Sequence, residues 1–261
     1  LGEADFLASV IGEGKIGDLE VLCCGGGFAH HCGFLLRVRV TNHATIPQAM
    51  GSSERTERLA ASPDLFENRL LNFFSRVHPV VPLLIYGPII ALLVWLGVDR
   101  GLSALATVGL FVGGILIWTL SEYWLHRLLF HWTPKFRGGD KINFIIHGVH
   151  HDHPNDKMRL VMPPAASIPL ALIFYAAFML IFGSPYGFVL FAGFLTGYLG
   201  YDYTHYYLHH FVPKSSIGKK VREHHMRHHF QDHHYGYGVS TPFWDHVFRT
   251  VPRSRKADRG S

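Results

Sequence analysis

"VVPLLIYGPIIALLVWLGV", residues 80–98, is a run of 19 residues without a charged side chain. A helix rises 1.5 Å per residue, so about 20 residues cross the roughly 30 Å hydrocarbon core of a bilayer. A run of this length and composition predicts a membrane-spanning helix. The other apolar runs decide how many such helices the chain contains.

Three more apolar runs follow: GLSALATVGLFVGGILIWTLSEYWL (101–125), LVMPPAASIPLALIFYAAFMLIFG (160–183) and SPYGFVLFAGFLTGYLGYDYTHYYL (184–208). Only Asp99 and Arg100 separate the first two runs, and the last two are contiguous, so the four runs predict two tight hairpins. Charged residues make up 16% of the chain, compared with about 25% in soluble domains. This shortage disfavours buried helices of a soluble protein. We expect an all-α integral membrane protein with four transmembrane helices.

Positive charge gathers on one side of these hairpins. The connections within each hairpin are short, whereas Lys and Arg are frequent before the first run, in the central loop and after the last run. By the positive-inside rule these three parts face the cytoplasm, where we expect a helical cap. The formal charge of +5 comes without a nucleic-acid motif, so it indicates a preference for anionic lipids and no nucleic-acid partner.

Composition divides the chain into four parts. Residues 1–49 precede the first methionine, Met50, and lack a signal-peptide pattern, so we expect a disordered leader or an over-extended reading frame. All three cysteines lie there, at spacings that fit no zinc site. We expect residues 50–79 to form an N-terminal cytoplasmic or interfacial segment. Residues 80–250 would form the membrane domain and 251–261 a basic tail.

Histidines form the second unusual feature. Fifteen of the twenty lie between His126 and His234, on the predicted cytoplasmic side. Four groups stand out: His126 and His131; His147, His150 and His151; His205 and His209; His225, His228 and His229.

Helix geometry explains most of these spacings, because residues three and four apart share a face. His205 and His209 can therefore point to one place, and the spacing of the two three-membered groups has the same property. The five-residue step from His126 to His131 is about 140° off-face at 3.6 residues per turn. We therefore expect a distorted or ended helix at that point.

Ten converging imidazoles indicate a metal site. Protonated rings would repel one another, and neutral rings buried together need a partner for each nitrogen. Neutral imidazole is the commonest metal ligand, and ten ligands exceed the four to six that one first-row ion accepts, so the count predicts two ions. Ligand type alone does not choose among iron, zinc, copper and nickel. Glu122 and Asp202 are candidates to accept the outer N–H of a ligand histidine, with hydration at the membrane interface as the alternative.

The histidine order resembles the sterol desaturase and fatty acid hydroxylase superfamily. Within it, the motifs EYWLHRLLFH, HGVHH, DKMRLVMPP, YDYTHYYLHH and GVSTPFWDHVFRT are similar to the fatty acid 2-hydroxylase (ceramide 2-hydroxylase) branch. The resemblance covers roughly residues 66–250. It implies that the metal ligands are His126, His131, His147, His150, His151, His205, His209, His225, His228 and His229. His153, His210, His224, His233 and His234 fall outside this set.

The resemblance also implies the chemistry. Two iron ions, for which zinc can substitute in purified protein, would use O2 to hydroxylate C2 of a fatty acyl chain, either free or in a ceramide-like lipid, with the apolar spans holding the acyl tail. Residues 1–79 match no cytochrome b5 haem motif, so we expect a separate electron donor, either cytochrome b5-like or a ferredoxin with its reductase. The membrane would be the endoplasmic reticulum or the bacterial inner membrane.

Two alternatives remain at this point. One is another oxygenase of the superfamily, acting on sterols or carotenoids, which the DKMRLVMPP stretch disfavours. The other is a membrane metal-binding or transport protein. A transporter should place its ligands near the middle of the bilayer, whereas these histidines cluster at one end of the predicted spans.

Overall fold

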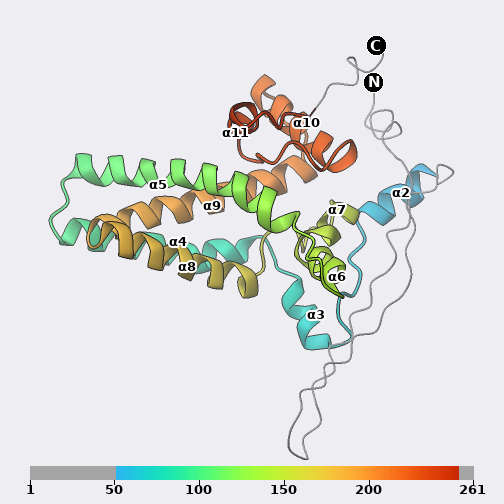
Figure 1. Ribbon diagram of the computed structural model, residues 1–261, viewed down its shortest axis with the longest axis horizontal. Coiled ribbons are helices and arrows are strands. Elements are labelled where there is room, and N and C mark those ends of the chain that lie inside the picture. The colour runs from blue at the N-terminus through green and yellow to red at the C-terminus, as the bar shows by residue number, and fades with distance from the viewer. Residues whose placement is uncertain (1–50, 253–261) are drawn as a thin grey trace, which may run out of the picture.

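The computed structural model describes residues 51–252, and every regular element in that range is helical (Figure 1). This confirms the expected all-α class. The expectations for residues 1–49, and for the tail beyond residue 252, lie outside the described residues.

Four long helices form an elongated bundle: α4 (Val80–Asp99), α5 (Ala104–Leu125), α8 (Pro164–Phe182) and α9 (Tyr186–His210). Three segments are long and apolar enough to cross a membrane, namely Val80–Asp99, Ala104–Phe130 and Pro164–Phe182. The predicted fourth run forms α9, which is long enough at 25 residues but is not among these three.

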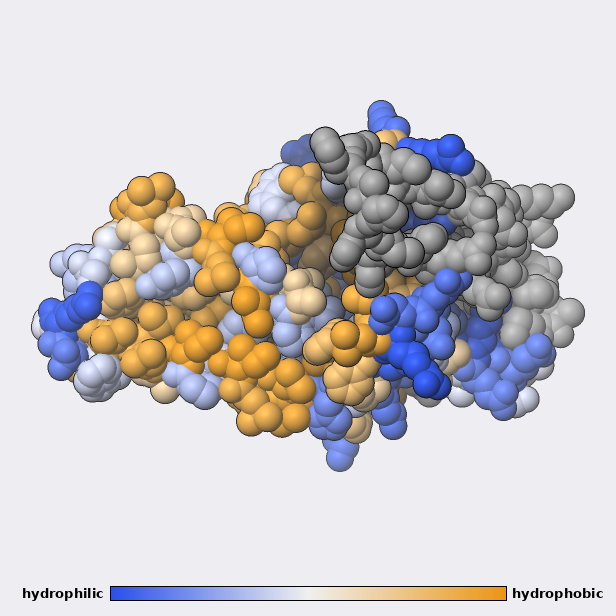
Figure 2. All heavy atoms as spheres, turned by 90° about the horizontal axis from the view of Figure 1, so that it is seen from below, coloured by the Kyte–Doolittle hydropathy of each residue, from blue (hydrophilic) through white to orange (hydrophobic). Residues whose placement is uncertain are grey.

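The position of α9 explains its lower hydropathy. It runs through the middle of the bundle and packs on α4, α5 and α8 (Figure 1), and most of its residues are buried. A helix enclosed by protein does not need the apolar exterior that lipid demands, so α9 can carry glycines, tyrosines and Asp202. The side chains that a bilayer would contact lie on the other helices, as with Leu105 at 84% and Leu180 at 88% exposed. Figure 2 shows an apolar surface over this part of the molecule, with hydrophilic residues toward both ends.

Glycines allow α5 and α9 to approach closely. A Cβ atom on Gly114 would lie 2.0 Å from the Leu190 carbonyl oxygen, and one on Gly193 would lie 2.0 Å from the Phe111 carbonyl oxygen. Gly197 likewise faces the Trp118 side chain. Small residues at helix contacts are a common way for membrane helices to pack, because close contact replaces the hydrophobic effect.

Substituting Gly193 with alanine is expected to destabilise the bundle by about 1–3 kcal/mol, the usual cost of overpacking. The new methyl group would meet a backbone carbonyl, which cannot rotate away. Thermal unfolding in detergent measures the effect. Gly200→Ala is the matched control on the same helix, because a Cβ there has nothing within 4 Å. Equal melting temperatures for the two variants would contradict the close approach.

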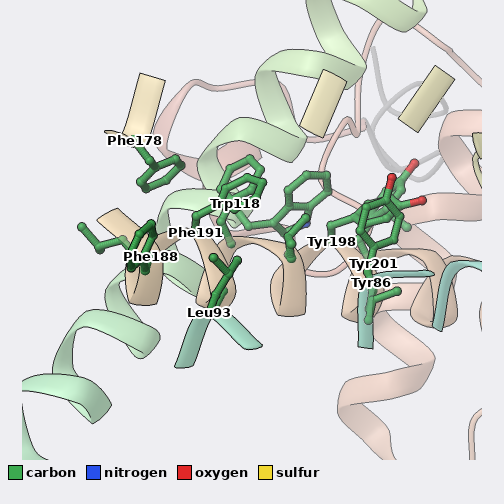
Figure 3. Close-up of a cluster of buried hydrophobic side chains, with 14 of the residues drawn as sticks. Tyr86, Leu93, Trp118, Phe178, Phe188, Phe191, Tyr198 and Tyr201 are labelled. Carbon is green, nitrogen blue, oxygen red and sulfur yellow. The ribbon is translucent and has the colours of Figure 1, made fainter. Parts of the chain in front are cut away.

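Aromatic rings fill the core of the bundle along α9. Trp118 of α5 packs edge-on against Phe194 and Tyr198, with ring centroids 5.1 and 5.4 Å apart. Figure 3 shows phenylalanines at one end of this cluster and Tyr86, Tyr198 and Tyr201 together at the other end. The core therefore changes from purely apolar to hydroxyl-bearing along the bundle.

Short helices gather at one end of the bundle (Figure 1). They are η1 (His126–Phe130), α6 (Gly139–Asn143), η2 (Phe144–Gly148), α7 (Val149–Asp152), α10 (Ser216–Phe230) and α11 (Phe243–Val247). Two further helices, α2 (Ser52–Leu59) and α3 (Arg69–Ser75), lie on the same side. We call this end the cap, and all four histidine groups lie in it or at its junction with the bundle.

Candidate metal centre

A π-helix brings the first two histidines together. η1 continues α5 with one wider turn. The His131 N–H donates to the His126 carbonyl at 3.3 Å, the hydrogen bond between residues five apart that defines a π-helix. Residues five apart therefore share a face here, although they would not in an α-helix. The side chains meet, with His131 Nε2 3.3 Å from His126 Nε2. The expected distortion of the helix is confirmed, and its form is a π-helical turn.

The ten predicted ligands form two sets of five. In each set the candidate ligand atoms all lie within 4.8 Å of one another. The first histidine group is His126, His131, His147, His151 and His228. The second histidine group is His150, His205, His209, His225 and His229.

Two short sequence motifs contribute to both groups. In α7 and the preceding turn, His147 and His151 join the first group, whereas His150 joins the second. In α10 the pattern is reversed, because His225 and His229 join the second group and His228 the first. Each i, i+4 pair thus shares one group, and the residue between them serves the other. The two groups therefore lie side by side.

The inward nitrogens converge in an arrangement that hydrogen bonds among the rings cannot fully satisfy. In the first group His147 Nε2 lies 3.0 Å from both His126 Nε2 and His151 Nε2. In the second group His209 Nε2 lies 2.9 Å from His225 Nε2. A neutral imidazole donates a hydrogen bond through one nitrogen and accepts one through the other. When several rings direct one nitrogen each to the same centre, hydrogen bonds between the rings cannot satisfy all of those nitrogens. His205 Nε2 is buried without a hydrogen-bond partner among the described residues. Such a donor set fits a cation at the centre of each group.

Backbone carbonyls hold the outer nitrogens of two histidines of the first group. His126 Nδ1 donates to the Tyr237 carbonyl at 2.6 Å, and His228 Nδ1 donates to the Tyr235 carbonyl at 2.7 Å. Placing the proton on Nδ1 leaves the Nε2 lone pair directed inward, the tautomer that a metal requires.

Burial keeps five of the proposed ligand histidines in the cap neutral. It lowers the pKa of His147, His150 and His228 well below the ordinary value, and neighbouring imidazoles lower the pKa further. His225 and His229 behave in the same way. Near pH 7 these rings are therefore in the unprotonated form that binds metal.

The two candidate acids do not bond directly to histidine. Glu122 accepts from the Val239 and Ser240 backbone N–H groups at 2.7 and 2.8 Å, and also from the Ser240 hydroxyl. It therefore anchors the segment whose Tyr237 carbonyl holds His126. Asp202 is 1% exposed and lies one turn before His205 on α9.

Asp245 is a site residue that the sequence analysis missed. It is fully buried and accepts from the Tyr237 N–H at 2.9 Å, the Gly238 N–H at 2.8 Å, the Thr250 hydroxyl at 2.8 Å and His224 Nε2 at 3.0 Å. Burial raises its pKa, but these hydrogen bonds outweigh burial and hold the pKa below its usual value. Asp245 thus shapes the turn that supplies the carbonyls for His126 and His228. The sequence feature that could have identified Asp245 is its position as a lone carboxylate in the apolar stretch PFWDHVF.

The five histidines left out of the ligand set belong to neither group. His224 bonds to Asp245, and His153 Nδ1 donates to the Arg58 carbonyl at 2.8 Å. The His233 ring stacks on His131 at 5.9 Å from outside the group, and its neighbour is His234. His210 lies on α9 beside Tyr206.

The DKMRLVMPP stretch joins the N-terminal segment to the cap. Arg159 pairs with Asp156 at 3.3 Å, both side chains being 4% exposed, and also donates to the Pro63 carbonyl at 2.5 Å. The Val77 N–H donates to the Met158 carbonyl at 2.7 Å. These bonds hold the loop after α7 in place and thereby support His150 and His151.

The amino-acid sequence is similar to those of known fatty acid hydroxylases. The family model described as fatty acid hydroxylase matches residues 111–250. A dihydroceramide fatty acyl 2-hydroxylase of Arabidopsis thaliana is 37% identical over 76% of this chain and 84% of its own length. A fatty acid 2-hydroxylase of Rattus norvegicus is 45% identical over 55% of this chain and 40% of its own length.

The fold has a counterpart among solved structures. The structure titled full-length Scs7p, in which only the hydroxylase domain is visible, superposes with a TM-score of 0.69 at 32% identity. The alignment covers 77% of this chain and 79% of the other. The likeness therefore extends over the helical bundle as well as the cap.

Proposed function

This chain belongs to the fatty acid hydroxylase family, and from that premise we propose that it is a membrane-bound oxidoreductase that hydroxylates C2 of a fatty acyl chain. The substrate would be a free fatty acid or the acyl group of a ceramide, as the names of the relatives suggest. The observation that carries the proposal is the pair of five-histidine groups lying side by side at one end of an apolar bundle.

We assign two iron ions to these groups, one to each set of five imidazoles. When bound, the irons supply the redox capacity to use O2 on an unactivated C–H bond, which zinc lacks. The overall reaction consumes one O2, two electrons and two protons, and it yields the 2-hydroxy acyl group and water. A separate protein, either cytochrome b5-like or a ferredoxin with its reductase, would deliver the electrons.

The membrane placement supports this assignment. Three helices are long and apolar enough to span, and α9 runs among them for a comparable length. We therefore place four spans in two hairpins, with α9 shielded from lipid by its neighbours. Arg and Lys in the N-terminal segment, the central loop and α10 support our placing the cap on the cytoplasmic side. The membrane would be the endoplasmic reticulum or a bacterial inner membrane, and residues 80–250 would form the hydroxylase domain.

The protein's own residues hold the metal ligands, orient them and enclose the site. The carbonyls of Tyr235 and Tyr237 fix the tautomers of two ligands, and Glu122 and Asp245 fix the segment that carries those carbonyls. Burial keeps the imidazoles neutral and excludes water from the reacting atoms. We further propose that Asp202, buried one turn before His205, exchanges a proton near the second histidine group.

Isotope labelling tests this function. With a suitable reductase and 18O2, the protein is expected to place 18O at C2 of acyl chains, because the oxygen comes from O2 and not from water. Lipid mass spectrometry with fragmentation locates the label. H2 18O under ordinary O2 is the control and should leave the product unlabelled. Label at another carbon, or in sterols alone, would assign the protein to a different oxygenase of the superfamily.

A further inference from the structure

A partly enclosed hollow lies in the bundle among α5, α8 and α9. Its enclosed part is about 20 Å³, and the figure is about 280 Å³ when the open space on its outer side is included, so it is a half-open groove. Its lining is mostly apolar and includes Trp118 from α5, Ala171 and Phe174 from α8, and Phe194 from α9. The Phe174 and Phe194 rings lie 4.5 Å apart and close the end that is farther from the cap.

Helix packing explains why the hollow exists. α5 and α8 both pack on α9, but they make little direct contact with each other. The gap between them faces outward from the bundle, where a bilayer would lie. Ala171 and Phe174 are half-buried at this gap, while the neighbouring Leu172 and Ile173 are 61% and 67% exposed. A lipid chain can therefore reach the hollow sideways from the bilayer.

The cap end of the hollow is the end nearer the second histidine group along α9. Ser167 and Tyr198 line that end, and the Tyr86 hydroxyl donates to Ser167 Oγ at 2.8 Å. Along α9, Tyr198 is followed one turn later by Asp202 and two turns later by His205. The seven residues from Tyr198 to His205 correspond to about 10 Å at 1.5 Å per residue.

This spacing matches an acyl chain held end-on. A fully extended polypeptide advances about 3.6 Å per residue over three backbone bonds, or roughly 1.2 Å per bond. An extended acyl chain has a similar length per bond, so about eight of its bonds span about 10 Å. With C2 beside His205, the hollow would begin near the tenth carbon. Ala171 lies one helical turn beyond Ser167, about 5 Å deeper.

From this arrangement, and resting on the proposed function, we propose that the hollow among α5, α8 and α9 binds the middle carbons of the acyl substrate. The chain enters between α5 and α8. Ala171 is then a specificity-determining residue, because its small side chain leaves space for carbons beyond about the tenth, counted at roughly 1.2 Å per bond. Phe174 and Phe194 limit how far a straight chain extends before it must turn out into the bilayer.

Photocrosslinking tests the binding site without any turnover. The probe is a long-chain fatty acid with a diazirine at about the tenth carbon, the position set by roughly 1.2 Å per bond, added to the full-length protein in vesicles. Peptide mass spectrometry is expected to place adducts on the hollow residues of α5 and α8, and excess unlabelled fatty acid should suppress them. Adducts spread over exposed positions such as Leu180, or adducts that resist competition as a structural lipid would, overturn the proposal.

Chain-length selectivity tests the role of Ala171. Ala171→Phe is expected to lower kcat/KM for a long acyl chain at least tenfold. A chain of about eight carbons, too short to reach the hollow by the bond-length estimate, should change less than twofold. Ala176→Phe adds the same ring at an exposed position of α8 and should leave both values unchanged. Equal losses on both chain lengths overturn the proposal.

The two proposals fail in different ways. If the wild-type protein hydroxylates a carbon other than C2, the proposed function fails while competed crosslinks in the hollow still support an acyl site there. If 18O appears at C2 but the crosslinks fall elsewhere, only the binding site is wrong.

Discussion

Replacing His209 with alanine is expected to reduce the bound metal from about two ions per chain to about one, and to lower 2-hydroxylation by at least about 100-fold. Losing a residue that only supports a ligand typically costs 10- to 100-fold, and His209 lies inside the second group, with Nε2 2.9 Å from His225 Nε2. The first group has no member on α9, so its ion should remain. Elemental analysis of purified protein gives the metal content, and labelled 2-hydroxy acid gives the activity.

The adjacent residue provides the control. His210 follows His209 on the same helix and belongs to neither group. His210→Ala therefore removes an imidazole from the same helix but from outside the histidine groups. It should keep about two ions and most of the activity. A His209→Ala variant that retains both ions, or a His210→Ala variant that loses one, would contradict the grouping of the ligands.

Replacing Asp245 is expected to have the second-largest effect, a loss of about 3–5 kcal/mol of stability in the cap, as when one partner of a buried ionic network is removed. Asp245→Ala leaves two backbone N–H groups and His224 without their acceptor. The turn at Tyr237 should loosen, and with it the carbonyl that holds His126. Weaker metal retention in the first group should accompany the lower melting temperature. Asp140→Ala, at an exposed aspartate of the cap, should change neither quantity.

The stability that Asp245 contributes is expected to decrease as the pH falls. The folded pKa of Asp245 lies below its usual value, so the ionised form contributes stability above the unfolded pKa of about 3.9. That contribution disappears as pH falls through the folded value. The difference in stability between wild type and Asp245→Asn should therefore be full at pH 7 and shrink below about pH 4. Melting curves across this range measure it, and a difference that grows on acidification would contradict the assignment.

Local patterns in the sequence predicted the helices and the composition of the site. Uncharged runs of about 20 residues have few stable states other than helices in an apolar environment, so the all-α class followed from composition. The resemblance implied the ten ligands, and the structure brings those ten together. The five-residue step at His126 could be recognised as irregular because 3.6-residue periodicity is a local property. Its form as a π-helical turn is seen only in the structure.

The sequence alone misjudged features that depend on packing. It treated the run at 184–208 like the other three, whereas α9 lies inside the bundle and is less apolar because protein surrounds it. It named Glu122 as a candidate to accept the outer N–H of a ligand histidine, with interfacial hydration as the alternative. The structure instead uses Glu122 to anchor Val239 and Ser240, more than 100 residues along the chain.

The sequence by itself determined that this chain is helical, apolar enough for a membrane and equipped with ten histidines at ligand spacing. Only the tertiary structure decided which five histidines face each centre. It also decided that Asp245 and Glu122 hold the segment that carries the Tyr235 and Tyr237 carbonyls, and that a hollow lies among α5, α8 and α9. The physical reason is the range of the interactions. Helical periodicity acts over three to five residues, whereas the division of His147, His150 and His151 between two centres depends on helices brought together from distant parts of the chain.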